Sequence, residues 1–442
     1  MSGITEAVKQ NKLHEEIKKI YSSGCKPKSE WKVGVEYERL PINNNSFKAV
    51  DYFSPNGICN FLRIFASNEN WDYILDGNEI IGLKQGHDTL TLEPGCQVEF
   101  SLEPQKNLAE IKNKINKLDL LIAPVLDEME ISLINYGVSP VSTNKTIKLI
   151  PKKRYAIMAK YLWGIFSDVM MRETAGIQGT FDFSDEEDGM RKFKIANMLS
   201  PFMTAMFANS PIRGGVDTGY KSFRALSWLN TDNDRCGYAV DFTKNITFDD
   251  YIKYVSDVPM LFINRFEKPI NFDGRVVFSE FSDYGYMGYG ANIDDYLLQA
   301  NLCFPEVRLS NYIEIRNHDC ASIDAVLSML AIYKGILYNT DAMNSIEELL
   351  SDLTLNDYSE LRYNVPKYAL ATPIKNYKIS DYAPKILEIA RTSLRNNFQN
   401  EDIYLNYIGE LVSDKTTQAD IILRNWNGIW NKDVSKLINH IS

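Results

Sequence analysis

The stretch Trp31-Lys32-Val33-Gly34-Val35-Glu36-Tyr37-Glu38-Arg39-Leu40-Pro41 (WKVGVEYERLP) decides the fold, because apolar and polar residues alternate along it. Such alternation is typical of a β-strand with one apolar and one polar face. Side chains two positions apart leave a strand on the same face, about 7 Å from each other. Glu36 and Glu38 are therefore expected on one face, either as part of a solvated surface or as part of a site.

The segments on both sides of this strand carry clear local signals. An amphipathic helix is expected over residues 4–20, where apolar residues recur at helical spacing. Residues 71–102 contain short apolar runs divided by Asp76-Gly77-Asn78, Gly86-His87-Asp88 and Pro94-Gly95. Because these are turn signals, the segment predicts an antiparallel meander of strands.

The remainder of the chain mixes strands with helices and then becomes mainly helical. A strand is expected over residues 174–183, and a helix over 186–209 with Ser184 as N-cap and Glu187 in the capping-box position. Further helices are expected over residues 107–131, 325–337, 345–350, 384–397 and 417–441. No flexible linker or fixed-period repeat is visible. We therefore expect an α+β fold in one catalytic domain, 1–442, whose part 321–442 is mainly helical.

More charged residues occur inside other strand candidates. Glu93 and Glu99 lie on either side of a Pro-Gly turn in LEPGCQVEF, residues 92–100. In FPEVRL (304–309) and YIEIR (312–316), glutamate and arginine alternate with apolar residues. The charged residues of interest in these two segments are Arg308, Glu314 and Arg316. Cross-strand salt bridges would also explain such pairs, but four such segments together favour a functional site.

Several carboxylates on one inner face predict a bound cation. Like charges a few ångströms apart repel strongly unless positive charge lies between them. With oxygen ligands and no cluster of histidine or cysteine, magnesium is favoured over zinc, and manganese is a further candidate. Magnesium bound by few protein carboxylates commonly carries nucleotide phosphates, and neighbouring arginines suit carboxylate or phosphate groups.

Composition excludes several other classes of function. With 442 residues, 45% of them hydrophobic, the chain can bury a large core. Its net charge of −10 and the lack of a dense Lys/Arg block argue against a nucleic-acid partner. Six scattered cysteines without a CxxC pair indicate reduced thiols and a cytoplasmic setting. No secretion signal, membrane-spanning run, GxxxxGK[ST] or GxSxG motif is visible.

Read together and in order, these segments resemble the glutamate-cysteine ligases of the plant and proteobacterial kind. The resemblance covers about residues 31–321, and the motifs follow one another in the family's order. The matching segments are Gly34–Glu38 for G-T-E-x-E, Leu92–Ser101 for L-E-P-G-G-Q-x-E-L-S, Pro151–Met158 for P-K-x-R-Y-x-x-M, Met170-Met171-Arg172 with Gln178, Asp182, Phe183 and Ser184 for M-M-x-R…Q-x-x-x-D-F-S, Phe207–Pro211, Thr231–Gly237 for T-D-x-D-R-x-G, Asp257–Met260, and Phe304–Arg308.

The resemblance implies a fold and a set of site residues. The fold is glutamine-synthetase-like: a curved antiparallel sheet, packed by helices, forms an active-site funnel with metals and nucleotide at one end and amino acids at the other. The implied magnesium ligands are Glu36, Glu38, Glu93, Glu99 and Glu314. The implied catalytic residues are Arg316 and Arg172, and the implied substrate- or nucleotide-binding residues are Arg154, Arg235, Arg308 and Gln178.

The activity implied by the resemblance is ATP-dependent ligation of the glutamate γ-carboxylate to the amine of cysteine, through a γ-glutamyl phosphate. Phosphoryl transfer needs in-line positioning and charge neutralisation, which metal-bound carboxylates and arginines supply. Expected partners are the small-molecule substrates glutamate, ATP and cysteine or another small amine, without nucleic acid or membrane. The protein is expected to act as a monomer or a homodimer.

Departures from the family pattern leave the amine acceptor open. Cys96 replaces a glycine, Thr180 lies in the segment that replaces Q-V-N-L-D, and His318 lies in the segment that replaces E-M-R-G-A-D-G. Because a few kilocalories of contacts decide selectivity, these changes admit a relative that uses a different amine. A catalytically inactive nucleotide-binding homologue is the least favoured alternative, since all five glutamates are present. No regulatory disulfide is expected.

Overall fold

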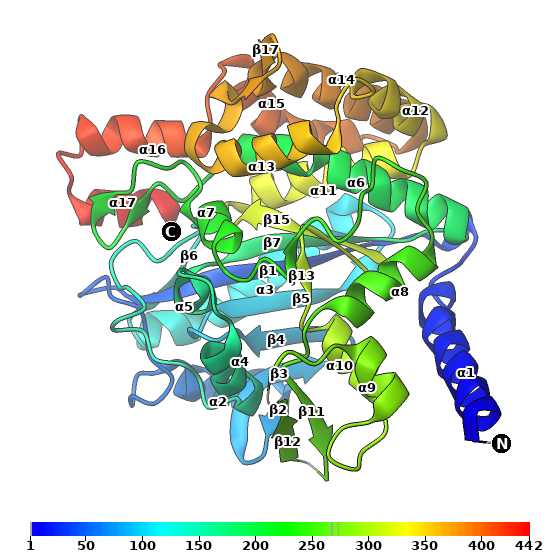
Figure 1. The fold of residues 1–442 in the computed structure, drawn as a ribbon. Coiled ribbons are helices and arrows are strands. Elements are labelled where there is room, and N and C mark those ends of the chain that lie inside the picture. Colours follow the sequence, from blue (N-terminus) through cyan, green and yellow to red (C-terminus); the bar gives the residue numbers. More distant parts are fainter. Residues whose placement is uncertain (1, 267, 273) are drawn as a thin grey trace.

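The computed structural model describes residues 2–266, 268–272 and 274–442, and its central feature is a nine-stranded sheet (Figure 1). The strands follow the order β14-β15-β7-β1-β5-β4-β3-β2, and β6 pairs with the far end of β1. Every neighbouring pair is antiparallel, which confirms the predicted meander. The strands of the sheet are β1 (Val33–Asn43), β2 (Asp72–Asp76), β3 (Glu79–Gln85), β4 (Asp88–Leu92), β5 (Val98–Gln105), β6 (Ile131–Ile134), β7 (Gly176–Phe181), β14 (Val307–Leu309) and β15 (Ile313–Asp319).

The register of the sheet gathers polar side chains on one face. Glu36 of β1 lies opposite Ser101 of β5 on one side and Gln178 of β7 on the other. Glu38 lies opposite Glu99 of β5. Since directly opposed residues point to the same side of a sheet, the alternation seen in the sequence becomes a continuous polar surface across three strands.

The opposite face of the sheet is apolar and covered by helices. Val35, Tyr37 and Phe100 point to this side and are buried. Helix α11 (Ile323–Leu337) packs so closely here that a Cβ on Gly179 would lie 3.1 Å from Leu330. In Figure 1 the C-terminal helices lie near the end of the sheet that contains β15, and β2 forms the far edge. The core therefore lies between the sheet and its helical layer, which leaves the polar face available for a site.

The predicted helices are present, but their bounds differ in places and the structure contains further helices that the sequence did not predict. Helix α6 starts after Asp185 rather than Ser184, because the Asp185 carboxylate accepts the Asp188 N–H at 2.9 Å. The helix expected over 417–441 is two helices, separated near Gly428. Within the described residues, nine helices, whose bounds follow, were not predicted: α2, α4, α5, α7, α8, α9, α10, α13 and α15. The remaining helices are α1 (Ser2–Ser22), α2 (Ile58–Glu69), α3 (Leu108–Glu128), α4 (Lys153–Tyr161), α5 (Ser167–Glu173), α6 (Glu186–Met206), α7 (Phe223–Leu229), α8 (Phe248–Asp257), α9 (Phe278–Tyr284), α10 (Ile293–Ala300), α12 (Thr340–Leu349), α13 (Leu355–Tyr368), α14 (Ile379–Asn397), α15 (Asn406–Ser413), α16 (Gln418–Asn427) and α17 (Val434–Ile441).

Short strand pairs outside the main sheet complete the fold. They are β8 (Ile212–Arg213) with β9 (Val216–Asp217), β10 (Cys236–Gly237) with β13 (Phe304–Pro305), β11 (Phe262–Arg265) with β12 (Lys268–Asn271), and β16 (Pro373–Ile374) with β17 (Tyr377–Lys378). The β10–β13 pair is parallel. Among the described residues, none of the helices combines the length and the apolar character needed to cross a membrane.

A buried ion pair ties the C-terminal helices to the rest of the fold. The Lys334 ammonium of α11 donates to Glu401 at 2.6 Å and to the Lys106 carbonyl at 2.8 Å. The other Glu401 oxygen accepts the N–H of Leu108, the first residue of α3. Lys334 and Glu401 are both buried. One carboxylate therefore holds α11, α3 and the segment before α15 together.

Replacing Lys334 with methionine should lower the free energy of unfolding by about 3 kcal/mol, because Glu401 loses its buried cation. Urea denaturation measures the loss. Adding Glu401→Gln to this variant should recover part of it. The exposed pair Lys253–Asp257 provides the control, and Lys253→Met should cost less than about 0.5 kcal/mol. Equal losses at the two lysines would contradict this assignment.

Candidate active site

Two adjoining cavities lie along the polar face of the sheet. The first, here called the carboxylate cavity, covers about 910 Å³, part of which is open to solvent, and its walls include Glu36, Glu38, Glu93 and Glu99. The second, here called the wide cleft, covers about 1790 Å³, part of which is open to solvent. Its walls include Lys26, Lys32, Lys106 and Asp182, together with Glu36. The two spaces therefore meet at Glu36.

Strand alternation and one tight turn bring the four glutamates of the carboxylate cavity together. Glu36 and Glu38 come from β1, and Glu99 comes from the neighbouring β5. Glu93 lies in the turn before β5. The Cys96 N–H closes this turn by donating to the Glu93 carbonyl at 3.0 Å. Cys96 has a φ of 72° in this turn, a conformation that favours glycine.

Neighbouring polar groups fix three of these carboxylates. Glu38 accepts the Gly176 N–H at 2.5 Å and an amide hydrogen of Gln178 at 3.2 Å. Glu99 accepts the hydroxyl of Thr91 at 3.0 Å and that of Ser101 at 3.2 Å. Glu93 accepts the Tyr155 hydroxyl at 3.1 Å. None of these donors carries a positive charge, so the acidic side chains are oriented without being neutralised.

Burial and mutual repulsion make the charged forms of Glu36, Glu38 and Glu99 unfavourable, and their pKa values are raised. Burial, with a contribution from Glu314, raises the pKa of Glu36 from 4.5 to about 7. Burial, with a contribution from Glu93, raises the pKa of Glu38 to about 7 as well. The pKa of Glu99 is also well above its ordinary value, because the side chain is buried and close to Glu36. A cation among these groups would relieve the penalty.

Glu314 differs from the other glutamates because two arginines bind it. Arg308 donates to both carboxylate oxygens, at 2.9 and 2.8 Å, and Arg316 donates to one of them. Burial raises the pKa of Glu314, but the two guanidinium groups outweigh it and hold that pKa below its ordinary value. Arg316 also donates to the Gln178 side-chain oxygen at 2.6 Å. Glu314 therefore orients Arg308 and Arg316, both of which line the carboxylate cavity.

The donor chemistry of the cavity fits a hard divalent cation, although the side chains do not enclose one as they stand. Four glutamates line the cavity, and all of the ligand atoms that they offer are oxygens. Within the described part of the chain, no three Asp, Glu, His or Cys side chains are arranged to hold one metal ion. Burial is the main cause of the raised pKa values of Glu36 and Glu38, and negatively charged neighbours add to it.

Two of the arginines expected at the site lie elsewhere. Arg172 donates to Asp168 at 2.5 Å and to the Ile147 carbonyl at 2.7 Å, and it lines neither cavity. Arg235 is buried, with donors to Asp232, to the Leu302 carbonyl and to the Pro259 carbonyl. Protein acceptors already engage these guanidinium groups, and the structure does not bring either residue into the two cavities. Their expected catalytic and binding roles stay predictions.

Arg154 and one unpredicted arginine do line the carboxylate cavity. Arg154, on α4, donates to the Asn301 carbonyl at 3.3 Å. Arg224, on α7, is only 3% exposed and donates to the Arg316 carbonyl at 2.9 Å. Trp228, one turn further along α7, lines the same cavity. The only signal for Arg224 in the sequence is a basic residue within the otherwise uncharged segment FRALSWL, which is too weak to identify a site.

Comparison with known proteins places residues 32–440 within the model of the glutamate-cysteine ligase family 2. The chain is 32% identical over 437 residues to the chloroplastic glutamate-cysteine ligase B of Oryza sativa subsp. japonica, covering 97% of this chain and 86% of that one. It is 33% identical over 430 residues to the chloroplastic glutamate-cysteine ligase of Medicago truncatula, covering 95% and 83% of the two chains.

One solved structure has a similar fold. Glutamate-cysteine ligase from Francisella tularensis, in complex with AMP, matches with a TM-score of 0.57 at 13% identity, covering 93% of this chain and 88% of that one. At this identity the match concerns the fold alone. Together with the antiparallel sheet, it confirms the expected α+β, glutamine-synthetase-like architecture.

Glu36→Gln should stabilise the metal-free protein at high pH. Because the pKa of Glu36 is raised from 4.5 to about 7, the folded state retains a proton that the unfolded state has released between these pH values. Stability contributed by this group therefore falls as pH rises through that window. We expect the variant to gain roughly 1 kcal/mol at pH 8 and almost nothing at pH 4.5.

Thermal unfolding in EDTA at the two pH values measures this difference. Glu348→Gln, at an exposed position of α12, provides the matched control and should change stability little at either pH. A gain for Glu36→Gln that does not depend on pH would contradict the electrostatic assignment.

Proposed function

Because the chain belongs to the glutamate-cysteine ligase family, we propose that it joins the γ-carboxylate of glutamate to the amine of cysteine, coupled to the cleavage of ATP to ADP. The observation that carries this proposal is the group of acidic side chains that lines the carboxylate cavity, in a chain matched by the family model over residues 32–440. We further propose that the whole chain acts as one catalytic unit.

The reaction proceeds in two steps. An oxygen of the glutamate γ-carboxylate attacks the γ-phosphorus of ATP, the bond to the β,γ-bridging oxygen breaks, and ADP leaves. The free amine of cysteine then attacks the acyl carbon of the γ-glutamyl phosphate. Phosphate leaves with the electrons of the C–O bond, and the nitrogen loses a proton. Both steps develop negative charge on phosphoryl oxygens, which cationic groups stabilise.

The two cavities suit different substrates. The wide cleft has room for a nucleotide, and three lysines in its walls can attract phosphate. The carboxylate cavity is smaller and has Arg154, Arg224 and Arg316 in its walls, which can bind the α-carboxylate of an amino acid. On this arrangement the γ-phosphate and the γ-carboxylate meet near Glu36.

Magnesium would be held by Glu36, Glu38, Glu93 and Glu99, and when bound it would neutralise phosphate charge. Neutral donors orient the oxygens of Glu38, Glu93 and Glu99, and Glu36 lines the same cavity. Manganese offers the same preference for oxygen ligands. A metal role for Glu314 stays a prediction, because two arginines already engage its oxygens.

Arg316 is our candidate for the group that contacts the transferring phosphoryl. It lines the carboxylate cavity, and contacts with Glu314 and Gln178 fix its guanidinium group. A fixed guanidinium needs little reorganisation when charge develops, which is the basis of electrostatic catalysis.

The family departures give little support for a different amine. Cys96 and His318 are completely buried, and neither lines the carboxylate cavity. Thr180 lines the wide cleft, at the end that we assign to the nucleotide. Because none of the three faces the space proposed for the amino acids, cysteine remains the favoured acceptor. The cytoplasmic setting and the monomeric or dimeric state stay predictions, and the plant relatives are named chloroplastic.

The direct test uses purified protein with magnesium, ATP, glutamate and cysteine. We expect equal amounts of ADP, phosphate and γ-glutamylcysteine, the last identified by mass spectrometry. Leaving out glutamate or adding excess EDTA should stop product formation. Turnover with another amine and none with cysteine would transfer the proposal to that amine. Absence of product with every amine would contradict the proposal.

Arg316→Lys should lower kcat by about 10²- to 10³-fold with little loss of folding, because a lysine cannot keep the planar contacts to Glu314 and Gln178. Steady-state kinetics and thermal unfolding together measure both effects. Arg235→Lys provides the contrast: its contacts lie outside the cavities, so it should lower stability more than kcat. The reverse pattern would remove Arg316 from the reaction.

A further inference from the structure

A buried lysine lies behind the wall of the wide cleft. Lys192, on α6, has no exposed surface and lines neither the wide cleft nor the carboxylate cavity. Its ammonium group donates to the Asp182 carbonyl at 2.9 Å and lies 2.8 Å from the Asp188 carboxylate. The same group lies 3.2 Å from the ring centre of Trp31 and 5.0 Å from that of Tyr338. One carbonyl, one carboxylate and two aromatic rings therefore surround the charge.

A lysine at this position is unfavourable for folding in itself. Burial lowers the pKa of Lys192 to about 8, although Asp188 and Asp182 favour the charged form. An apolar side chain of similar length would fill the space without this penalty. The role of Lys192 is therefore expected in the contacts that only a cation makes, and two of these lead to the wall of the wide cleft.

The first contact leads through Trp31 to the segment 26–32. The indole Nε1 of Trp31 donates to the Lys26 carbonyl at 3.0 Å. The Trp31 ring is held from its other neighbour as well, because its centre lies 4.8 Å from that of Tyr338. Lys26 and Lys32, at the two ends of this segment, line the wide cleft. The cation–π contact with Lys192 therefore fixes the middle of a segment that carries two lysines of the cleft.

The second contact leads through Asp182 to the same two lysines. The Asp182 carboxylate accepts the ammonium group of Lys26 at 2.9 Å and the backbone N–H of Lys32 at 2.7 Å. Since Lys192 binds the carbonyl of Asp182, it fixes the backbone from which this carboxylate extends. An ammonium group has three N–H bonds, so Lys26 keeps two for a ligand in the cleft.

Side chains continue the connection between β1 and β7 beyond the end of their ladder. The last backbone pair at this end is Val33 with Phe181. One residue further on, the Tyr338 hydroxyl accepts the Asp182 N–H at 2.8 Å and donates to the Lys32 carbonyl at 2.5 Å. The backbone at this end of the cleft is therefore held by side chains that pack around Lys192, and not by strand pairing.

We propose that Lys192 is a positioning residue for nucleotide binding in the wide cleft. It fixes Trp31 and Asp182 from behind the wall. These two residues hold Lys26 and Lys32 where their ammonium groups contact the phosphates. The inference rests on the proposed function, which assigns the nucleotide to the wide cleft.

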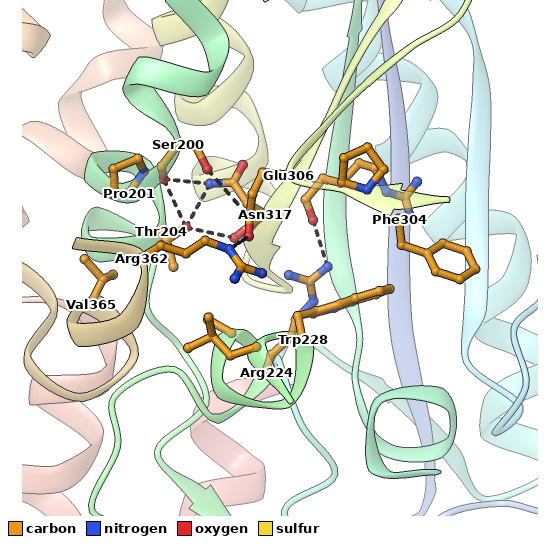
Figure 2. A pocket seen from close by; sticks show the side chains of 14 residues that line it. Ser200, Pro201, Thr204, Arg224, Trp228, Phe304, Glu306, Asn317, Arg362 and Val365 are labelled. Atoms are coloured by element: carbon orange, nitrogen blue, oxygen red, sulfur yellow. Dashed lines mark hydrogen bonds and ion pairs between the residues drawn. The ribbon is translucent and has the colours of Figure 1, made fainter. Parts of the chain in front are cut away.

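The other two cavities do not include the residues around Lys192. A third cavity, drawn in Figure 2, adjoins the carboxylate cavity, since Arg224, Trp228, Phe304 and Arg316 line both spaces. Neither space has Lys192 or any of its four contacts in its walls. A change at Lys192 should therefore alter the affinity for the nucleotide and leave the affinity for glutamate nearly unchanged.

Lys192→Met keeps the length of the side chain and removes its charge. We expect the KM of ATP to rise about tenfold, while kcat at saturating ATP and the KM of glutamate change less than about twofold. The dissociation constant of a non-hydrolysable ATP analogue with magnesium, measured by calorimetry, should rise by the same factor. Trp31→Phe removes the N–H that binds the Lys26 carbonyl and should raise both values about threefold.

Arg265→Met provides the matched control. Arg265 is also a cation held by a buried carboxylate and an aromatic ring, those of Asp295 and Tyr289, and it lines none of the three cavities. This variant should lower the unfolding temperature without changing the affinity for the nucleotide. Thermal unfolding shows whether each variant is folded, and if Lys192→Met is not, Trp31→Phe decides the question.

The outcomes separate the positioning role from the function on which it rests. Natural nucleotide affinity in a folded Lys192→Met protein would overturn the role, and so would an equal rise in the KM values of ATP and glutamate. If Lys192→Met does not fold, natural affinity in Trp31→Phe would overturn it. A natural protein that binds the analogue but forms no product would overturn the ligase function alone, and the affinities would still decide the role. A natural protein that does not bind the analogue would overturn both.

Discussion

Mutual repulsion among acidic side chains is the constraint on which the rest of this structure depends. The register of β1 with β5 and β7 places Glu36, Glu38 and Glu99 on one face of the sheet. Burial makes their charged forms unfavourable, as the raised pKa values show. The apolar core on the other face, with Tyr37 and Phe100, stabilises the strands strongly enough to hold this arrangement.

Two kinds of positive charge serve different parts of the polar face: arginine side chains beside Glu314, and the proposed metal ion beside the glutamates of β1 and β5. Arg308 and Arg316 bind Glu314 directly, so this corner is already neutralised. The hydrogen bonds to Glu38 of β1 and Glu99 of β5 come from neutral donors. A metal ion can therefore bind beside the β1 and β5 glutamates while Arg308 and Arg316 stay fixed beside Glu314. Phosphoryl transfer uses both kinds of positive charge to neutralise the phosphate oxygens.

The sequence predicts the acidic part of the site well because strand geometry has a simple period. Positions two apart in VEYE must share a face, whichever partners the strand finds. The roles of arginines are harder to predict, because their long side chains can reach several different hydrogen-bond acceptors. Asp168 lies four residues before Arg172, and Asp232 lies three residues before Arg235. These local acceptors engage both side chains outside the two cavities. Arg224 reaches the site only through the placement of α7, which no local pattern determines.

The bulge in β15 has a consequence for the chemistry of the whole cavity. Ile315 pairs with Gly179 and His318 pairs with Ile177, so two residues of β15 face one of β7. A regular strand would point position 318 the same way as Glu314 and Arg316. The extra residue instead rotates the imidazole into the interior, between Phe207 and Tyr333, where burial lowers its pKa to about 3. One inserted residue thus removes the only nitrogen ligand of the strand from the polar face and leaves a hard, purely oxygen-based donor set for the cation.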